Sequence, residues 1–426
     1  MVLTLSNKNT ENAQNLRRTN VATLVGTFLE QHDFLVYAHL VPVLTAVFLG
    51  PESTSTQGFL IFAVGYLCRP LGGLFFGHIG DRFGRKRAML MSISIMSVPT
   101  LIIGILPSYA QIGVAAGVIL YLCRALQSIS VSGEVAGAAI IMIENAIPGR
   151  KFFAVSLFCS IFYFGGVVGA LSGWFFTRPS MPSWAWRIAF LIGSLIALVG
   201  FYFRSKALET PEFELALQQK KLLRTPVLET LKKDWISHFC YIGLSASSSG
   251  VYSYIIAYIP KVMKSNFGYT VNESLVVSMG FTSILVFLVP LSGFISDKIG
   301  PRKVIALGNI LVTLILPFAL RAMEFDSPDS FFLFQALACI AFAIQQGSVS
   351  SVNKYMYPTE RRYSGSALGQ GLGMALIGGF TPLILNSLQN KVGSFWGPSI
   401  FIIFCQLAAL ISLYFAPSFL EAKSNS

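Results

Sequence analysis

The sequence predicts an all-α membrane protein with twelve transmembrane helices arranged as two related bundles of six. Hydrophobic residues make up 54% of the 426 residues and charged residues only 12%, which is too apolar for a water-soluble globule. We identify twelve apolar segments of about 20 residues each, the length that a hydrocarbon layer of ~30 Å requires. A short polar motif also occurs twice, about half a chain apart, so we expect the chain to be built from two similar halves.

The apolar segments follow one another with short polar connections, except in the middle of the chain. They lie near residues 22–48, 57–77, 88–106, 111–133, 153–177, 186–203, 237–260, 273–295, 303–321, 330–352, 363–388 and 396–416. The expected parts are a tail (1–20), a first bundle (21–203), a linker (204–236), a second bundle (237–416) and a second tail (417–426). The linker carries Leu and Glu at helical spacing, which favours a helix along the inner membrane surface.

The positive charge of the chain follows this topology. The formal net charge is +12, but 23 of the 31 Lys and Arg fall on one side of the membrane if both termini are cytoplasmic. The charge therefore indicates orientation and not nucleic-acid binding. The first 20 residues lack the apolar core of a secretory signal, so the first segment is expected to act as the insertion signal. The six Cys all lie in or beside apolar runs without CxxC spacing, so we expect packing roles and no metal site.

The first apolar segment contains two acids. Spacing of three and then four residues places Glu30, Asp33 and Tyr37 on one helical face. Because charge inside a span is costly, this face is expected to look into the bundle or a water-filled cavity. Counting ~1.5 Å per residue from Ala22 places Asp33 about 17 Å deep. The alternative role for these acids is a structural ion pair with an intramembrane Arg, and His32 is expected to be a packing residue.

Two arginines lie inside spans. Arg69, in the second segment, is twelve residues before Asp81, or about 18 Å from the polar connection. Arg124 lies deep in the fourth segment. A buried guanidinium needs a carboxylate partner, from the first segment or from a substrate.

The polar connection between the second and third segments runs from Gly77 to Arg87, and its echo runs from Gly293 to Lys303. We expect it to form an inner gate. Arg85 is expected to pair with Glu134 across the same mouth. The residues assigned to gating are Gly77, Asp81, Arg85, Glu134, Asp297 and Arg361.

The second half offers neutral hydrogen-bonding groups in its spans, among them Tyr252, Gln345 and Gln346. Its segment Pro358 to Gly365 also matches Pro148 to Lys151 at an offset of about 210 residues. Two related six-helix halves with a site near the membrane midplane are one arrangement of secondary transporters.

These motifs resemble a known family. The Gly77–Arg87 connection resembles the loop 2–3 signature of the major facilitator superfamily, and Arg124-Ala125-Leu126-Gln127 resembles its helix 4 signature. Further motifs resemble the metabolite:proton symporter branch, which includes carriers of proline and betaine, 2-oxoglutarate, citrate and shikimate. Those motifs are Leu29-Glu30, Asp33-Phe34 with Tyr37, Arg69-Pro70-Leu71-Gly72-Gly73, Gly133-Glu134, Trp186-Arg187, Glu209-Thr210-Pro211 and Pro358-Thr359 to Gly365.

The sequence departs from the family pattern in the presumed cavity. Gln31-His32 replaces the aromatic pair between the acids, Thr27 replaces an Asn, and Ser128 and Ser132 replace Gly. These departures concern substrate choice more than fold. The resemblance implies the major facilitator fold, a location in the cell membrane of a bacterium (the inner membrane), and a functional monomer. In that fold the second helix lies beside the eleventh, so the resemblance also implies that Asp81 lies against the first turn of the helix that begins near Ser364, where unpaired N–H groups stabilise a carboxylate.

The function expected from the sequence is proton-driven symport of a small organic acid or zwitterionic metabolite. No phosphate-binding Gly-x-x-x-x-Gly-Lys-Ser/Thr loop is present, so we expect no ATP and no cofactor other than the coupling proton. Glu30 and Asp33 are the proton candidates because protonation removes the cost of burying a carboxylate. Arg69 and Arg124 are the candidates for binding an anionic group. The further substrate candidates are Tyr37, Gln127, Tyr252, Gln345 and Gln346.

Three other functions stay open at this point. An exporting antiporter on the same fold differs only in the direction of coupling. A sensor derived from a transporter binds its ligand without moving it. An intramembrane enzyme is disfavoured, because neither His-Glu-x-x-His nor Gly-x-Ser-x-Gly occurs.

Overall fold

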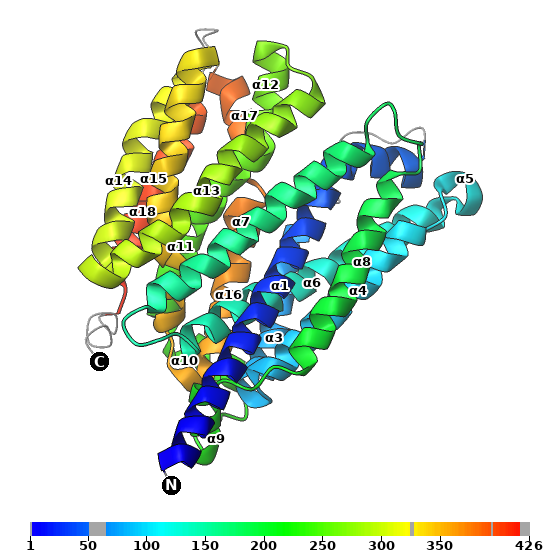
Figure 1. The fold of residues 1–426 in the computed structure, drawn as a ribbon. Coiled ribbons are helices and arrows are strands. Elements are labelled where there is room, and N and C mark those ends of the chain that lie inside the picture. The colour runs from blue at the N-terminus through cyan, green and yellow to red at the C-terminus, as the bar shows by residue number, and fades with distance from the viewer. Residues whose placement is uncertain (1, 51–64, 324–327, 393–394, 418–426) are drawn as a thin grey trace.

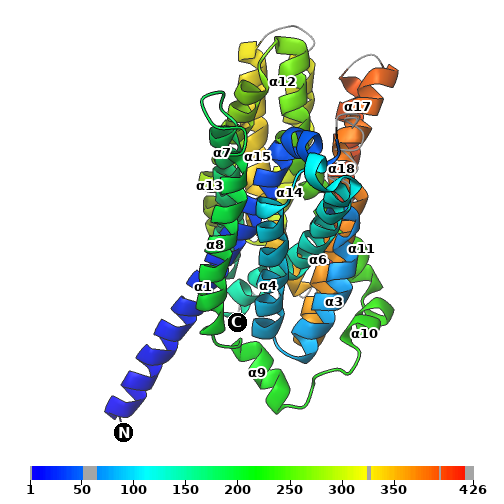
Figure 2. The ribbon, with the colours of Figure 1, turned by 90° about the vertical axis from the view of Figure 1, so that its right-hand side faces the viewer.

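The computed structural model describes residues 2–50, 65–323, 328–392 and 395–417, and every regular element in this part of the chain is a helix (Figures 1 and 2). The first half contains α1 (Val2–Phe48), α3 (Arg69–Arg82), α4 (Arg85–Ile105), α5 (Tyr109–Ile112), α6 (Val114–Glu144), α7 (Lys151–Phe176) and α8 (Trp186–Ser205). The linker forms α9 (Pro211–Gln218) and α10 (Pro226–Lys233).

The second half is helical in the same way. It contains α11 (Trp235–Ser253), η1 (Tyr254–Tyr258), α12 (Ile259–Phe267), α13 (Val271–Ile299), α14 (Pro301–Ala322), α15 (Pro328–Tyr355), η2 (Thr359–Arg361), α16 (Arg362–Gly373), η3 (Met374–Gly378), α17 (Thr381–Val392) and α18 (Trp396–Phe415). The elements η1 and η3 are single π-helical turns inside longer helices, and η2 is a 3₁₀ turn.

The predicted all-helical membrane fold is confirmed. Nine helices within the described residues are long and apolar enough to cross a membrane. The predicted segments 22–48 and 237–260 are helical as well, whereas residues 57–64 of the second segment lie outside the described residues. Most of the twelve predicted segments are therefore helical in the structure, and the count of twelve is not fully confirmed.

Several helices continue beyond the apolar segments that predicted them. Residues 2–20, expected as a tail, continue α1, which projects past the other helices in Figure 2. Helix α6 ends at Glu144 and not near residue 133. The apolar segments were chosen to match the thickness of the hydrocarbon layer. A helix can extend beyond that layer wherever its i→i−4 hydrogen bonds are made.

The two halves meet along two helix pairs, α3 with α16 and α7 with α13, and the second pair lies side by side in Figure 1. Glycines allow the close approach. A Cβ on Gly73 would lie 2.8 Å from the carbonyl oxygen of Ala367, and one on Gly77 would lie 2.7 Å from Cα of Ser364. On the other side, a Cβ on Gly293 of α13 would overlap Ser156 of α7. The linker helix α10 contacts both α3 and α16 at one end of this interface.

The packing of α3 against α6 yields a test of the fold. A Cβ on Gly72 would overlap the backbone carbonyl of Ile129, whereas a Cβ on Gly280 of α13 meets no atom within 4 Å. Because backbone cannot move aside cheaply, Gly72→Ala should cost about 1–3 kcal/mol and lower the Tm of the purified protein. Gly280→Ala is the matched control and should leave the Tm unchanged or slightly higher. Equal Tm values for the two variants would contradict this packing.

Candidate functional site

The first acid of α1 is buried without a partner. The Glu30 side chain is 1% exposed, and neither of its carboxylate oxygens has a hydrogen-bond partner among the described residues. A buried carboxylate in this condition carries the full cost of desolvation when it is ionised. No hydrogen bond within the described residues therefore stabilises the ionised form of Glu30.

The second acid of α1 is hydrogen-bonded. Asp33 accepts from the Thr100 hydroxyl of α4 at 3.0 Å, and Nδ1 of His32 lies 3.2 Å from its other oxygen. The amide nitrogen of Gln127 on α6 donates to the same Thr100 hydroxyl at 2.8 Å. Arg124 in turn donates to the amide oxygen of Gln127 at 3.0 Å. A continuous chain of hydrogen bonds thus joins Asp33 to Arg124 across three helices.

The two intramembrane arginines rest on aromatic rings. Cζ of Arg124 lies 3.6 Å from the centre of the Tyr37 ring, and Cζ of Arg69 lies 4.5 Å from that of Tyr66. Arg69 also donates to the sulfur of Met374. Nε of each arginine has no hydrogen-bond partner among the described residues. Cation–π contacts hold both guanidinium groups while leaving donors unused.

No ion pair joins these arginines to the acids of α1 within 4.0 Å in the described part of the chain. The structural ion pair considered for Glu30 and Asp33 is thus not seen. Instead, Asp33, Arg69, Arg124 and Gln127 line one small cavity within the first half. Its remaining lining residues are Phe34, Gly65, Met96, Ser128 and Val131.

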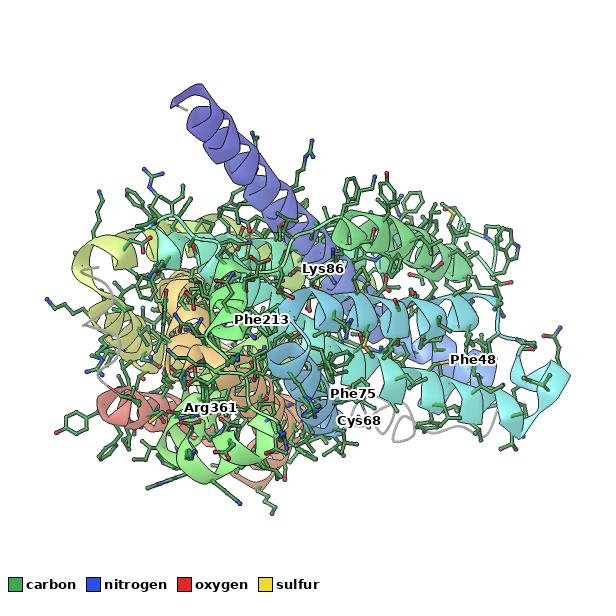
Figure 3. All side chains as sticks on the ribbon, turned by 90° about the horizontal axis from the view of Figure 1, so that it is seen from below. Phe48, Cys68, Phe75, Lys86, Phe213 and Arg361 are labelled. Atoms are coloured by element: carbon green, nitrogen blue, oxygen red, sulfur yellow. The ribbon has the colours of Figure 1, made fainter. Side chains whose placement is uncertain are left out.

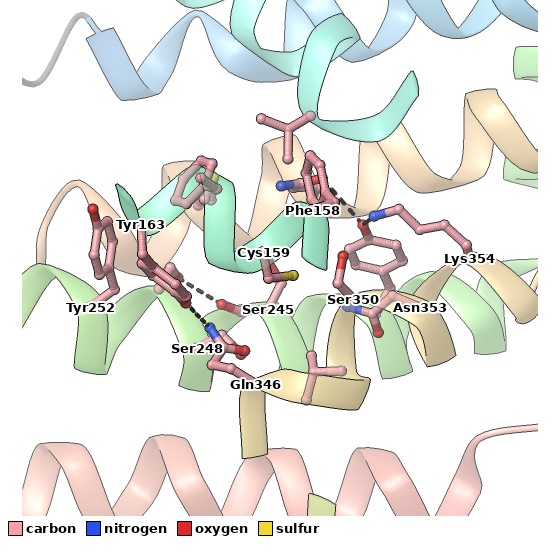
Figure 4. Close-up of a pocket in the computed structure, with 17 residues that line it drawn as sticks. Phe158, Cys159, Tyr163, Ser245, Ser248, Tyr252, Gln346, Ser350, Asn353 and Lys354 are labelled. Atoms are coloured by element: carbon pink, nitrogen blue, oxygen red, sulfur yellow. Dashed lines mark hydrogen bonds between the residues drawn. The ribbon is translucent and has the colours of Figure 1, made fainter. Parts of the chain in front are cut away.

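A larger cavity lies between the two halves and is drawn in Figure 4. Tyr252 lines it, and its hydroxyl accepts a hydrogen bond of 2.9 Å from Gln31 of α1. Gln346 lines it as well, donating to the Tyr163 hydroxyl of α7 at 2.9 Å and accepting from Ser248 of α11 at 3.0 Å. Both predicted residues therefore bridge the two halves at the cavity wall.

The structure places Gln345 elsewhere. It is fully buried and donates to the Ser247 hydroxyl at 2.8 Å, within a polar cluster that includes Asn309 and Gln406. It lines neither of the two cavities. Adjacent residues of a helix point about 100° apart, and here Gln346 faces the cavity whereas Gln345 points into the polar cluster.

At one end of the interface, Asp81 lies on the first turn of α16. Its oxygens accept from the backbone N–H groups of Tyr363 at 3.0 Å and Ser364 at 2.8 Å. Asp297 does the same for α7, accepting from Phe152 and Phe153 at 2.9 Å each. The repeat seen in the sequence thus returns as two equivalent contacts, each joining a helix of one half to a helix N-terminus of the other.

A cluster of buried charges surrounds Asp81, and Figure 3 looks onto this end of the molecule. Arg85 lies 3.4 Å from Asp81 and 3.5 Å from Glu144, and donates to the Thr359 carbonyl at 2.6 Å. Arg362 donates to Glu144 at 2.8 Å and to Glu212 of α9 at 2.6 Å. We call Asp81, Arg85, Glu144, Glu212 and Arg362 the gate cluster. It ties the first half, the linker and the second half together.

The predicted pair of Arg85 with Glu134 is wrong. Glu134 accepts instead from Arg204 of α8 and, at 2.9 Å, from Ser92. It precedes Glu144 by ten residues on α6, which is about 15 Å along the helix, so it lies too deep to reach Arg85.

Arg361 does not join the gate cluster either. It pairs with Asp234, with one N–O distance of 3.0 Å, and so ties η2 to the start of α11. Its neighbour Arg362 takes the position between the halves. The two arginines are adjacent in the sequence, but Arg361 ends η2 whereas Arg362 is the first residue of α16. Their side chains therefore point to different partners.

Glu209 of the linker caps α4 beside this cluster. Its carboxylate accepts from the backbone N–H groups of Arg85 at 3.1 Å and Lys86 at 3.2 Å. Burial raises the pKa of Glu209, and the N–H donors of Thr210 and Lys86 oppose that shift.

Sequence reasoning missed Glu144, Arg362 and Lys354, the last of which lines the larger cavity. Residues 135 to 143 are apolar or small, a signal that the fourth helix continues to Glu144. Lys354 follows Gln346 by two steps of four residues, a spacing that keeps it on the same side of the helix. No sequence signal separated Arg362 from Arg361.

Comparison with known proteins decides the family. A family model described as "Sugar (and other) transporter" matches residues 19–238, and one described as "Major Facilitator Superfamily" matches residues 240–426. The chain belongs to the major facilitator superfamily. As a member of this superfamily it is a multi-pass membrane transporter and not an enzyme.

Individual members of the superfamily resemble the whole chain. The proline/betaine transporter of Salmonella typhimurium is 30% identical over 93% of this chain and 82% of its own. The ectoine/proline transporter ProP of Corynebacterium glutamicum is 28% identical over 97% of this chain and 86% of its own. The inner membrane metabolite transport protein YhjE of Escherichia coli is 30% identical over 88% of both chains. The resemblance drawn from the motifs is thereby confirmed.

Solved structures of the superfamily share the fold. The proton:xylose symporter XylE bound to 6-bromo-6-deoxy-D-glucose matches with a TM-score of 0.77 at 19% identity, covering 95% of this chain and 97% of its own. The E. coli fucose:proton symporter FucP matches with a TM-score of 0.67 at 14% identity, covering 94% and 98%.

The gate cluster predicts a large effect of removing one carboxylate. Glu144→Gln leaves the buried Arg85 and Arg362 short of an anionic partner and should destabilise the protein by about 3 kcal/mol. Glu229, which pairs with Lys233 on the exposed face of α10, offers the same substitution as a control. Thermal unfolding of the purified variants measures both. A loss of stability from Glu144→Gln no larger than that from Glu229→Gln would show that the cluster is not a stabilising network.

Proposed function

We propose that this protein is a proton-coupled symporter of a small organic acid or zwitterionic metabolite. It works by alternating access in the inner membrane of a bacterium, with both termini in the cytoplasm. The observation that carries the proposal is the hydrogen-bonded chain from Asp33 to Arg124, because it joins a group that can titrate to a group that can bind an anion.

The proton binds at the acids of α1. Ionised Asp33 accepts from Thr100, and Thr100 accepts from Gln127. Protonation gives Asp33 an O–H group, which can donate a hydrogen bond to the Thr100 hydroxyl. Thr100 then accepts from Asp33 as well as from Gln127, and the hydrogen bond between Gln127 and Arg124 changes in turn. Glu30 is the second candidate, since it has no hydrogen-bond partner in the described residues to stabilise its charge. Neutralising a buried carboxylate shifts the balance between the two states of such a bundle.

The anionic group of the substrate binds at Arg124 and Arg69. Both are buried, both rest on aromatic rings, and both have unused donors in the described structure. Arginine is suited to bidentate carboxylate binding, and Tyr37 holds the plane of Arg124. Proline, betaine and ectoine, named for the relatives, all carry a carboxylate. Tyr252 and Gln346 contribute neutral contacts from the second half.

The gate cluster closes the cytoplasmic mouth, and Asp81 and Asp297 release the two helix ends when it opens. A carboxylate at a helix N-terminus is stabilised by roughly 0.3–1 kcal/mol when exposed and up to ~2 kcal/mol when partly buried. That scale suits a contact broken in every transport cycle. Gly77 allows α3 to reach Ser364 at the same place.

Uptake into proteoliposomes tests the proposal. Labelled proline, glycine betaine and succinate are supplied outside, with the pH lower outside than inside. Symport predicts accumulation of one of them above its external concentration, abolished by a protonophore. Accumulation only with the opposite pH difference identifies an antiporter, and binding without uptake identifies a sensor.

Asp33→Asn should uncouple transport from the proton gradient. With one proton per substrate, a pH difference of one unit supports about tenfold accumulation, and the Asn variant should reach only about onefold. Exchange of labelled for unlabelled substrate should persist, because substrate binding at Arg124 is retained. Asp329→Asn, at an exposed acid of α15, is the control and should accumulate substrate normally. Full accumulation by Asp33→Asn would make Glu30 the proton carrier.

A further inference from the structure

One side of α15 forms a wall of the larger cavity. Gln346, Ser350 and Lys354 follow one another at steps of four residues, so they lie above one another on the same helical face. Figure 4 draws this wall, with Tyr252 near one end of the cavity and Lys354 near the other. The residues that line the cavity are Val135, Phe158, Cys159, Phe162, Tyr163, Tyr241, Ser245, Ser248, Ser249, Tyr252, Gln346, Val349, Ser350, Asn353, Lys354, Gln370 and Met374.

Lys354 is the charged side chain of this lining. It is 1% exposed and donates one hydrogen bond of 2.7 Å to the Tyr241 hydroxyl. Tyr241 in turn donates to the amide oxygen of Gln370 at 3.4 Å, so its own hydrogen is directed away from Lys354. An ammonium has three donors, and this contact accounts for one of them.

No acid among the described residues pairs with this charge. The cavity lining contains neither Asp nor Glu, and no ion pair of Lys354 occurs among the described residues. A buried ammonium without a counter-charge is costly, more so inside a membrane span. The acids of the gate cluster pair with Arg85 and Arg362, and none of them forms an ion pair with Lys354 in the described structure.

The remainder of the cavity is neutral and partly aromatic. The rings of Tyr163 and Tyr252 meet with their centres 5.3 Å apart, and Ser248 and Gln346 supply hydrogen-bonding groups beside them. Asn353, one residue before Lys354, has a buried amide oxygen with no hydrogen-bond partner in the described structure. This surface is suited to bind the uncharged part of a small molecule, or a group whose charge is spread over several atoms.

We propose that Lys354 binds a carboxylate of the transported molecule in this cavity, with Tyr241 holding its ammonium in place. The remainder of the ligand then lies against Tyr163 and Tyr252. The inference rests on the proposed function and deepens it, because it adds a second anion-binding position, on the second half, to that of Arg69 and Arg124. A dicarboxylate occupies both positions, and a monocarboxylate occupies one or the other. Arg69 and Arg124 lie on the first half, and Met374, which lines the larger cavity, contacts Arg69 between the two positions.

The test compares ligand binding with and without the charge. Lys354→Met removes the ammonium at similar length, and Lys354→Gln keeps a donor for Tyr241 in case the first variant does not fold. Lys391→Met is the control, since Lys391 also lies in the last turn of a helix but is exposed. The probes are proline, glycine betaine and succinate, with prolinamide and succinamide as counterparts that lack the carboxylate. Thermal unfolding of each purified protein against probe concentration gives the apparent affinity.

We expect one or more of the carboxylates to stabilise the wild type and Lys391→Met, with the amides inactive. In Lys354→Met and Lys354→Gln the same probe should bind about tenfold more weakly or worse, the loss typical of a charge-assisted hydrogen bond. Equal affinity in the wild type and both Lys354 variants overturns the inference alone. A wild type that no carboxylate stabilises, or that the amides stabilise equally, contradicts the proposed substrate class and the Lys354 assignment with it.

Discussion

The cost of burying a charge inside a membrane span distinguishes two sets among the buried charged residues of this protein. The first set lies at one end of the interface between the halves, where Asp81, Arg85, Glu144 and Arg362 satisfy one another. The second set is buried without an ion pair: Glu30 has no hydrogen-bond partner in the described structure, and the cavity that Lys354 lines contains no acid. The paired set can hold the structure closed, and the second set can respond to a proton and an anion.

The same constraint links the two sets. Helix α3 carries Arg69 near its start and Asp81 near its end, so one rigid element reaches both the small cavity and the gate cluster. Helix α15 likewise carries Gln346 and Lys354 on the cavity wall and ends beside the gate. Ligand or proton binding that tilts either helix must act on the contacts at its end, which is what coupling between cavity and gate requires.

Sequence reasoning succeeded where a local pattern or the family resemblance determines the geometry. The resemblance, which implies that the second and eleventh helices are neighbours, placed Asp81 beside Ser364, and the spacing in α1 placed Asp33 deep in the bundle. It failed where the partner depends on depth along a helix. Glu134 and Glu144 lie on the same helix, and only the true end of α6 decides which one meets Arg85. The predicted apolar segment ends at residue 352 and therefore leaves out Lys354, although the helix continues to Tyr355.

The most direct test of the account measures whether the Asp81 contact sets the balance between closed and open gates. Spin labels on Arg82→Cys and Lys298→Cys, at exposed positions on the ends of α3 and α13, report the separation of the halves by pulsed electron paramagnetic resonance in a variant without its other cysteines. Asp81→Asn should raise the ratio of long to short distances by about 2- to 30-fold, the range for losing ~0.3–2 kcal/mol of helix-end stabilisation. An unchanged distance distribution, in a variant that still folds, would contradict the gate.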